Sequence, residues 1–171
     1  AQSFSQKGQS GIDLAIMKDF KPCVILEAKK HNDTDMINKE NLHKKSLYES
    51  ILYFLRERDE GNKEIFHIII TDFYSWFIFD AKDFDRLFWQ NSSIKKIYKN
   101  YKNPNLLGNN TKDFYEDIEK ELNKNFMENL FDDKEIPCAY FNLLEPKNEK
   151  DLQNIYKLLS SDTLLKEFNP N

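Results

Sequence analysis

Glycine, proline and cysteine are scarce in this chain of 171 residues, which contains 4 Gly, 5 Pro and 2 Cys. With so few of these residues a long flexible linker is not expected, and the length suits one domain, or one domain with an appendage. Cys23 and Cys138 lie far apart, so they offer neither a disulfide framework nor the spacing of a zinc site. We expect both to be small buried residues in a reducing cytosol.

Long apolar runs are also missing. The longest, Ile65 to Ile70, has the length of a strand, whereas a membrane span needs about 20 residues. No secretory signal is visible. We therefore predict a cytoplasmic protein that does not bind membranes. The chain starts at Ala1 without Met and ends on Asn171, and both ends are expected to be cuts through a longer polypeptide.

An excess of positive charge is missing as well. Lys and Arg total 25, Asp and Glu total 29, and the formal net charge is −4. This balance argues against a protein that coats DNA non-specifically. It argues only weakly against a nuclease, whose own carboxylates add negative charge. Hydrophobic residues make up 40% of the chain and charged residues 32%, which is enough for a real core.

Two strands near the N-terminus are predicted to form an antiparallel hairpin. The segment Ile12 to Met17 alternates in character, and Cys23 to Ala28 is a short apolar run. Lys18 to Pro22 is predicted to be the turn, with Pro22 stopping backward extension of the second strand. A helix is then predicted from Leu42 to Arg58, where apolar residues repeat at helical spacing, with asparagines before it as possible caps.

Two further strands are predicted after this helix, from Ile65 to Thr71 and from Trp76 to Asp80. The order strand, strand, helix, strand, strand predicts an α/β fold of the α+β type, with a mixed central β-sheet flanked by helices. We assign this core to residues 1–90. Residues 91–171 are predicted to be a mostly helical extension that leads toward a missing connector.

Helices in the extension are indicated by short amphipathic patterns. Thr111 is predicted to cap a long helix, and Asp151 to Leu159 forms a shorter one. The stretch Lys95 to Lys102 mixes basic and aromatic residues that could contact phosphates and stack on bases, although a solvated helix face is the favoured explanation. His67 lies in a predicted buried strand and is expected to be a hydrogen-bonded core residue.

Charged residues interrupt the second hairpin strand at its end. Because side chains alternate along a strand, Glu27 and Lys29 are predicted to share one face, and Asp13 lies on the neighbouring strand. An unpaired buried charge costs several kcal/mol, so these groups need an explanation.

Phosphodiester hydrolysis explains these residue types. Asp13 and Glu27 can bind Mg²⁺, which prefers oxygen ligands and usually takes one or two carboxylates. The metal lowers the pKa of a bound water, and Lys29 can stabilise the negative charge that develops on oxygen. A simple Glu27–Lys29 ion pair on an exposed edge is the alternative, because the pattern is loose. Three features favour a catalytic role over this ion pair. They are the two adjacent strands, the apolar residues before Glu27 and the helix that follows.

With these residues in view, two segments resemble the PD-(D/E)xK nuclease superfamily: Gly11-Ile12-Asp13-Leu14-Ala15-Ile16 and Val24-Ile25-Leu26-Glu27-Ala28-Lys29-Lys30. More narrowly, they look like the N-terminal nuclease domain of single-chain (type IIG) restriction-modification enzymes. The likeness covers residues 8–80 and is looser beyond. It implies a restriction-endonuclease-like core and a metal-dependent DNA endonuclease that acts as the cleavage module of such an enzyme.

The resemblance also implies roles for individual residues. Asp13, Glu27 and the backbone carbonyl of Ala28 would bind Mg²⁺, with Mn²⁺ as a possible substitute, and Lys29 would be the catalytic lysine.

Some superfamily members add a Gln-x-x-x-Tyr pair on the next helix. Glu49 and Tyr53 have this spacing, with Glu in place of Gln, so we take both as candidate catalytic residues. The alternative for Glu49 is a surface pair with Lys45.

The expected partners follow from the same resemblance. They are double-stranded DNA, methyltransferase and specificity segments in the same full-length chain, and possibly a second copy for cutting both strands. Two other functions stay open. One is a non-catalytic restriction-endonuclease-like module for binding or assembly, which the acidic net charge favours, and the other is a DNA-repair nuclease.

Overall fold

A computed structural model describes residues 11–105, 110–126, 136–145 and 149–166. Five strands form one sheet in the order β1 (Leu14–Lys18), β2 (Lys21–Ala28), β3 (His67–Thr71), β4 (Ser75–Asp80) and β5 (Ala139–Asn142). β2 and β3 are parallel, and every other neighbouring pair is antiparallel. The crossover from β2 to β3 contains helix α1 (Lys45–Asp59), because parallel strands need a long connection.

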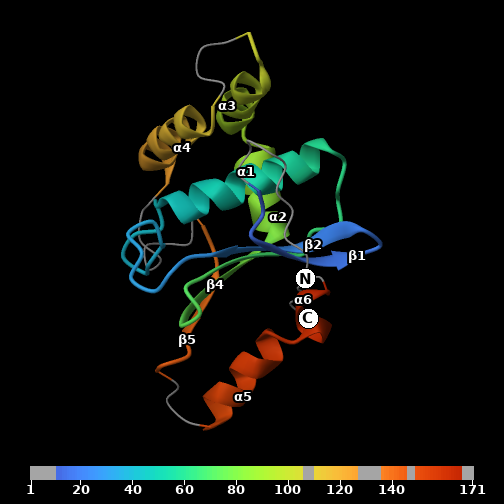
Figure 1. The fold of residues 1–171 in the computed structure, drawn as a ribbon, viewed down its shortest axis with the longest axis vertical. Coiled ribbons are helices and arrows are strands. Elements are labelled where there is room, and N and C mark those ends of the chain that lie inside the picture. The colour runs from blue at the N-terminus through green and yellow to red at the C-terminus, as the bar shows by residue number, and fades with distance from the viewer. Residues whose placement is uncertain (1–10, 106–109, 127–135, 146–148, 167–171) are drawn as a thin grey trace.

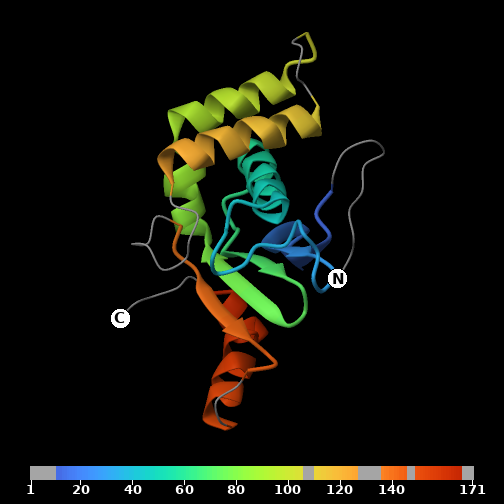
Figure 2. The same cartoon turned by 90° about the vertical axis from the view of Figure 1, so that its left-hand side faces the viewer.

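Six further helices follow β4 in the residues that the structure describes. They are α2 (Ala81–Phe84), the π-helix η1 (Asp85–Trp89), α3 (Ser92–Lys102), α4 (Thr111–Asn125), α5 (Glu149–Leu158) and α6 (Ser161–Leu164). α1 crosses one face of the sheet with α3 and α4 beyond it, and α5 and α6 lie on the other side (Figures 1 and 2). The predicted α+β class, with a mixed sheet flanked by helices, is therefore confirmed.

The predicted hairpin is present, but its turn is shorter than predicted. Only Asp19 and Phe20 join β1 to β2, with φ values of 48° and 66°. Such a two-residue turn matches the twist of a hairpin. Pro22 therefore lies inside β2, opposite Met17, and does not stop the strand. Its missing N–H is tolerated because pairing with β3 begins only at Val24.

Helix α1 begins at Lys45, three residues later than predicted. The side chain of Asn41, a predicted cap, instead accepts a hydrogen bond from the backbone N–H of His43 in a turn before the helix. Ten consecutive residues of α1, from Ser46 to Leu55, are buried. The helix is thus the central element of the core.

The long helix α4 confirms the prediction of a helix beginning at Thr111, but its cap differs. The side chain of Asn110 accepts a hydrogen bond from the backbone N–H of Asp113 and caps the helix, so Thr111 is its first residue. None of the helices in the described part of the chain is long and apolar enough to cross a membrane.

The two faces of the sheet bury separate apolar clusters. Ile25 and Ile68 belong to the cluster beneath α1, whereas their neighbours Val24 and Ile69 belong to the cluster on the opposite face. We call the first face the α1 face. Alternation along β2 therefore assigns residues 27 and 29 to the α1 face.

Strand β5 was not predicted. Its residues pair with β4, placing Tyr140 opposite Phe77, and so the segment beyond residue 90 completes the sheet. A strand of four partly exposed residues has too little apolar alternation to be recognised in a sequence.

Candidate active site

Three charged side chains meet on the α1 face, where β2 ends. Lys29, one residue after β2, places its Nζ 2.7 Å from Glu27 Oε1 and 2.5 Å from Glu49 Oε2. Glu27 belongs to β2, and Glu49 lies on the second turn of α1. One ammonium group therefore bridges two carboxylates from different elements, and Glu27 and Lys29 share a face as predicted.

Both glutamates are buried. Glu27 is 1% exposed, and Glu49 is 8% exposed. The Oε2 atom of Glu27 has no hydrogen-bond partner among the described residues. Lys45 Nζ lies 3.8 Å from Glu49 Oε1, so the alternative Lys45–Glu49 contact also exists. Because Glu49 is buried, however, this contact is not the simple surface pair that was considered.

Asp13 lies one residue before β1. The hairpin register, which pairs Leu14 with Leu26, extends to place Asp13 opposite Glu27. Its Oδ2 accepts a hydrogen bond of 3.1 Å from the backbone N–H of Ala28. The negative charge of Asp13 also contributes to the raised pKa of Glu27, so the two carboxylates lie within electrostatic reach. Glu27 thus forms the buried floor of the site and Asp13 its exposed rim.

The site has more negative charge than its single bridging ammonium group can balance. Burial and the charge of Glu49 raise the pKa of Glu27 to about 8, against the hydrogen bond and charge of Lys29. Burial alone would lower the pKa of Lys29, but its hydrogen bonds to Glu27 and Glu49 outweigh burial and raise that pKa. Both shifts show that the buried carboxylates of Glu27 and Glu49 favour positive charge close to them.

This charge imbalance leads to a stability prediction. Glu27→Gln is expected to be more stable than the wild type at pH 8, on the order of 5 °C in Tm, with the difference vanishing toward pH 5. Between the ordinary value of 4.5 and about 8, the folded protein binds more protons at Glu27 than the unfolded chain does. The free energy of unfolding of the wild type therefore falls as pH rises through this window, and Gln has no such titration.

Thermal unfolding of both proteins at pH 5, 6.5 and 8 measures this effect. Glu64→Gln is the matched control, because Glu64 is exposed in the connection before β3, at the other end of the parallel strands. A difference in Tm between Glu27→Gln and the wild type that does not change with pH would contradict the raised pKa.

The residues fit a divalent cation with few protein ligands. No group of three or more His, Cys, Asp and Glu side chains is arranged to hold a metal ion within the described ranges. In the part of the chain that the structure describes, the oxygens available are the buried Oε2 of Glu27, which has no hydrogen-bond partner there, and the exposed carboxylate of Asp13. Mg²⁺ usually takes one or two carboxylates and completes its shell with water and substrate oxygens. This donor set suits Mg²⁺ and does not suit zinc, which takes three or four nitrogen, sulfur or oxygen ligands from the protein.

Two other predicted residues lie close by. Tyr53, one helical turn after Glu49, is 3% exposed and packs in the apolar cluster beneath α1. Ala28 donates its N–H to Asp13. The catalytic role of Tyr53 and the metal-binding role of the Ala28 carbonyl stay predictions.

Sequence reasoning missed a histidine–carboxylate pair at the same edge of the sheet. His31 Nδ1 lies 2.9 Å from Asp72 Oδ2. Asp72 directly follows β3, and His31 lies three residues after the end of β2. Because β2 and β3 are parallel, their C-terminal ends meet at one edge. The order strand, helix, strand contains the signal for this pairing, since it favours a parallel crossover.

The basic stretch Lys95 to Lys102 lies on α3 and makes contacts within the fold. Lys95 Nζ lies 5.0 Å from the centre of the Trp89 ring, and Lys102 forms an ion pair with Asp59. These contacts support the structural explanation that the sequence favoured.

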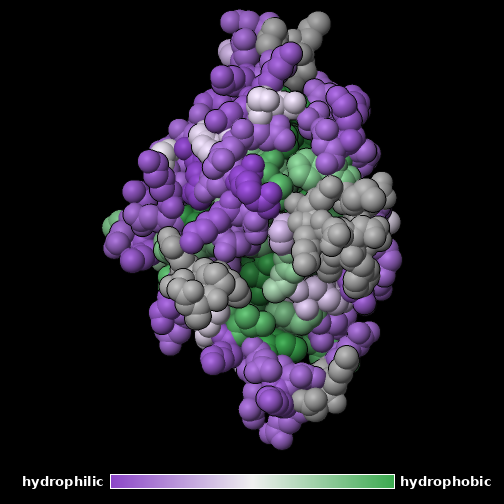
Figure 3. Space-filling model, turned by 180° about the vertical axis from the view of Figure 1, so that it is seen from behind, coloured by the Kyte–Doolittle hydropathy of each residue, from purple (hydrophilic) through white to green (hydrophobic). Residues whose placement is uncertain are grey.

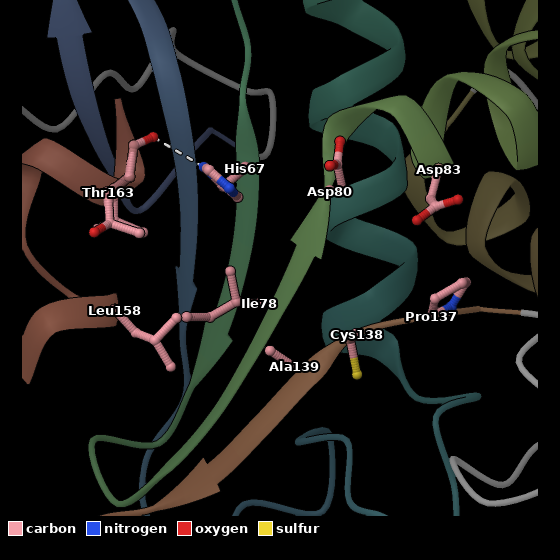
Figure 4. Close-up of a pocket in the computed structure, with 10 residues that line it drawn as sticks. His67, Ile78, Asp80, Asp83, Pro137, Cys138, Ala139, Leu158 and Thr163 are labelled. Atoms are coloured by element: carbon pink, nitrogen blue, oxygen red, sulfur yellow. Dashed lines mark hydrogen bonds between the residues drawn. The ribbon is translucent and has the colours of Figure 1, made fainter. Parts of the chain in front are cut away.

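A cavity lies on the face of the sheet opposite α1. From behind, apolar side chains gather among hydrophilic ones (Figure 3). A cavity of about 230 Å³ is lined there by β3, β4, β5 and the C-terminal helices (Figure 4). His67 lines it, and its Nδ1 donates a hydrogen bond of 2.9 Å to the carbonyl of Leu164, as expected for a hydrogen-bonded core histidine. Burial raises the pKa of Cys138 in its wall to about 12, which keeps it a thiol.

Comparison with known proteins identifies a family for this chain but does not indicate a function. A family model described as "Domain of unknown function (DUF7149)" matches residues 1–171. The searches of curated proteins and of solved structures gave no match.

Proposed function

Because the chain belongs to the DUF7149 family, whose description names no activity, we propose a function from the site itself: a metal-dependent endonuclease that hydrolyses DNA phosphodiester bonds. The observation that carries the proposal is the buried Glu27: among the described residues one of its oxygens has no hydrogen-bond partner, and the other is bridged through Lys29 to Glu49. A carboxylate kept in this environment is poised to bind a cation. We assign Glu27 that role, together with Asp13, which directly precedes the adjacent strand β1.

Each side chain then has a distinct task. Asp13, Glu27 and the carbonyl of Ala28 would hold Mg²⁺, which lowers the pKa of a bound water and neutralises phosphate charge. Lys29 presents a positive charge to the phosphate oxygens as negative charge builds up on them. Glu49 orients the ammonium group of Lys29 and keeps it protonated.

The fold supports a restriction-endonuclease-like core. A hairpin carries the acidic residues, a crossover helix follows, and β3 returns parallel to the strand that bears Glu27. We propose further that the protein is the cleavage module of a restriction-modification enzyme that acts on double-stranded DNA. Methyltransferase and specificity segments in the same chain, and a dimer for cutting both strands, belong to the same proposal.

A non-catalytic binding or assembly module is the second candidate, and one observation favours it. Lys29 contacts both Glu27 and Glu49, as in an ion-pair network that only maintains a fold.

A DNA-repair nuclease would share the site and the chemistry. Mapping the cut positions on DNA separates repair from restriction, because a restriction module cuts at a defined distance from a recognition sequence and a structure-specific nuclease does not.

The direct test is metal-dependent cutting of supercoiled plasmid. The purified protein is expected to produce nicked or linear plasmid with Mg²⁺ or Mn²⁺ and to lose this activity completely in EDTA, because the bound metal would lower the pKa of the attacking water and balance the charge of the phosphate. Gel electrophoresis of the plasmid over time measures it. Cutting that persists in EDTA would contradict the mechanism. If DNA binding is retained with both metals but no cutting occurs, the non-catalytic candidate is favoured.

A further inference from the structure

We propose that His31 is the general acid of the reaction, donating a proton from Nε2 to the oxygen that leaves phosphorus, and that Asp72 positions it. This inference rests on the proposed endonuclease function. It adds a proton donor to a site whose other residues bind cations or carry fixed charge.

Both members of the pair lie beside the site on the same face of the sheet. Ile68 and Ile70 of β3 face α1, so alternation places Asp72 on the α1 face as well. The backbone N–H of Lys29 donates to the carbonyl of Thr71 over 2.8 Å, which continues the β2–β3 ladder to the residue before Asp72. Asp72 and Lys29 are therefore neighbours across two parallel strand ends.

His31 is close to Lys29 along the chain. At about 3.3 Å per extended residue, two residues span at most roughly 7 Å. The proposal places one phosphodiester group within this span, between the ammonium group of Lys29 and the ring of His31.

The geometry around Asp72 fixes the orientation of the imidazole. Asp72 is 7% exposed, and its Oδ1 accepts hydrogen bonds from the backbone N–H groups of Tyr74 at 3.1 Å and Ser75 at 2.6 Å. Its Oδ2 is turned to His31 Nδ1 at 2.9 Å. Although burial raises the pKa of Asp72, the hydrogen bonds from Ser75, His31 and Tyr74 together lower it, so Asp72 stays a carboxylate and accepts a hydrogen bond from the N–H at Nδ1.

The remaining contacts leave the His31 ring partly accessible. The Tyr74 ring packs edge-on against the imidazole, with the ring centres 4.7 Å apart. The side chain of His31 is nevertheless 50% exposed. With Nδ1 bound to Asp72, Nε2 is the ring nitrogen on the opposite side, which is the arrangement used where histidine transfers protons.

The protons of the step balance through solvent. A water molecule releases one proton to bulk solvent and attacks phosphorus as hydroxide, and the bond from phosphorus to the leaving oxygen breaks. Its electron pair stays on that oxygen and takes the proton from Nε2 of the imidazolium. The products are a phosphate end and a hydroxyl end, and the neutral imidazole regains a proton from solvent.

A substrate with a better leaving atom tests this role. Once the cut position and the end bearing the phosphate are mapped on the plasmid, a synthetic duplex carries sulfur in place of the leaving oxygen at that bond. A thiolate leaves without a proton donor. His31→Ala is expected to cut the oxygen duplex about 10²–10⁴-fold more slowly than the wild type, and to cut the sulfur duplex within about threefold of the wild-type rate.

The comparison variants separate the possible outcomes. Glu27→Gln should be inactive on both duplexes, and Asp72→Asn should follow His31→Ala with a smaller loss, restored by the sulfur. His31→Gln, which keeps a hydrogen-bonding side chain, guards against a folding defect, and thermal unfolding checks every variant.

Three results would overturn the inference. Equal losses on both duplexes would show that His31 only ties the strand ends together, and unchanged cutting of the oxygen duplex would show no role at all. A wild-type protein that cuts neither duplex would remove the proposed function itself, and this inference with it.

Discussion

Glu27→Gln is expected to reduce the rate of plasmid cutting by at least about 10³-fold, which corresponds to roughly 4 kcal/mol of transition-state stabilisation. The substitution keeps the shape of the side chain and removes its charge. Because Glu27 is the buried carboxylate of the site, its loss would deprive the proposed metal of a ligand, and a bound metal contributes several kcal/mol to phosphoryl chemistry.

The same variant is expected to be more stable than the wild type at pH 8, because the burial and the neighbouring charge of Glu49 penalise the ionised Glu27. Loss of activity together with a gain in stability cannot arise from unfolding. Initial rates of plasmid cutting measure the first effect, and binding of Mn²⁺ by calorimetry checks the cause. Glu64→Gln, which removes an equal charge, should leave both unchanged. Activity within tenfold of the wild type would exclude Glu27 as a metal ligand.

Lys29→Met should abolish cutting and lower the free energy of unfolding by about 3–5 kcal/mol. The wild-type ammonium lies within 2.7 Å of Glu27 and 2.5 Å of Glu49, and its side chain is only 14% exposed. Methionine has a similar length but no charge, so two buried carboxylates would be left facing each other. Breaking a buried pair on one side costs far more than an exposed pair is worth.

Chemical denaturation of the variant measures this loss, and Lys21→Met is the matched control. Lys21 begins the same strand, at its exposed opposite end, and should change stability by less than about 0.5 kcal/mol. The double variant Glu27→Gln with Lys29→Met should regain part of the stability and none of the activity. A loss below 1 kcal/mol for Lys29→Met alone would mean that the bridge between the two glutamates does not hold the folded state together.

Much of the fold follows from local patterns. The hairpin, the crossover helix and the two strands after it were all predicted, because each has a clear apolar period. The boundaries that differ depend on contacts that no period encodes. Pro22 is accommodated inside β2 because β3 starts pairing beyond it, and α1 starts late because Asn41 forms a turn of its own. β5 is recognisable only once β4 is there to pair with it.

The site was predictable to the extent that it lies on neighbouring strands. Alternation alone places Glu27 and Lys29 on one face, and the hairpin brings Asp13 opposite them. The position of Glu49 depends on how α1 packs over the sheet, so spacing indicated the residue but not its contact with Lys29. His31 and Asp72 are 41 residues apart. Their contact requires the parallel pairing of β2 with β3, which an isolated strand pattern does not specify.

Helix α1 belongs to both the core and the candidate site. Its ten buried residues fill the apolar centre, and one of them, Glu49, also clamps the ammonium group of Lys29. The clamp joins residues 20 positions apart in the chain, so it forms only when the crossover has closed and the helix has docked. The complete charged cluster therefore depends on the docking of α1. A substitution that shifts α1 on the sheet, even one distant from the site, would change the contact between Glu49 and Lys29.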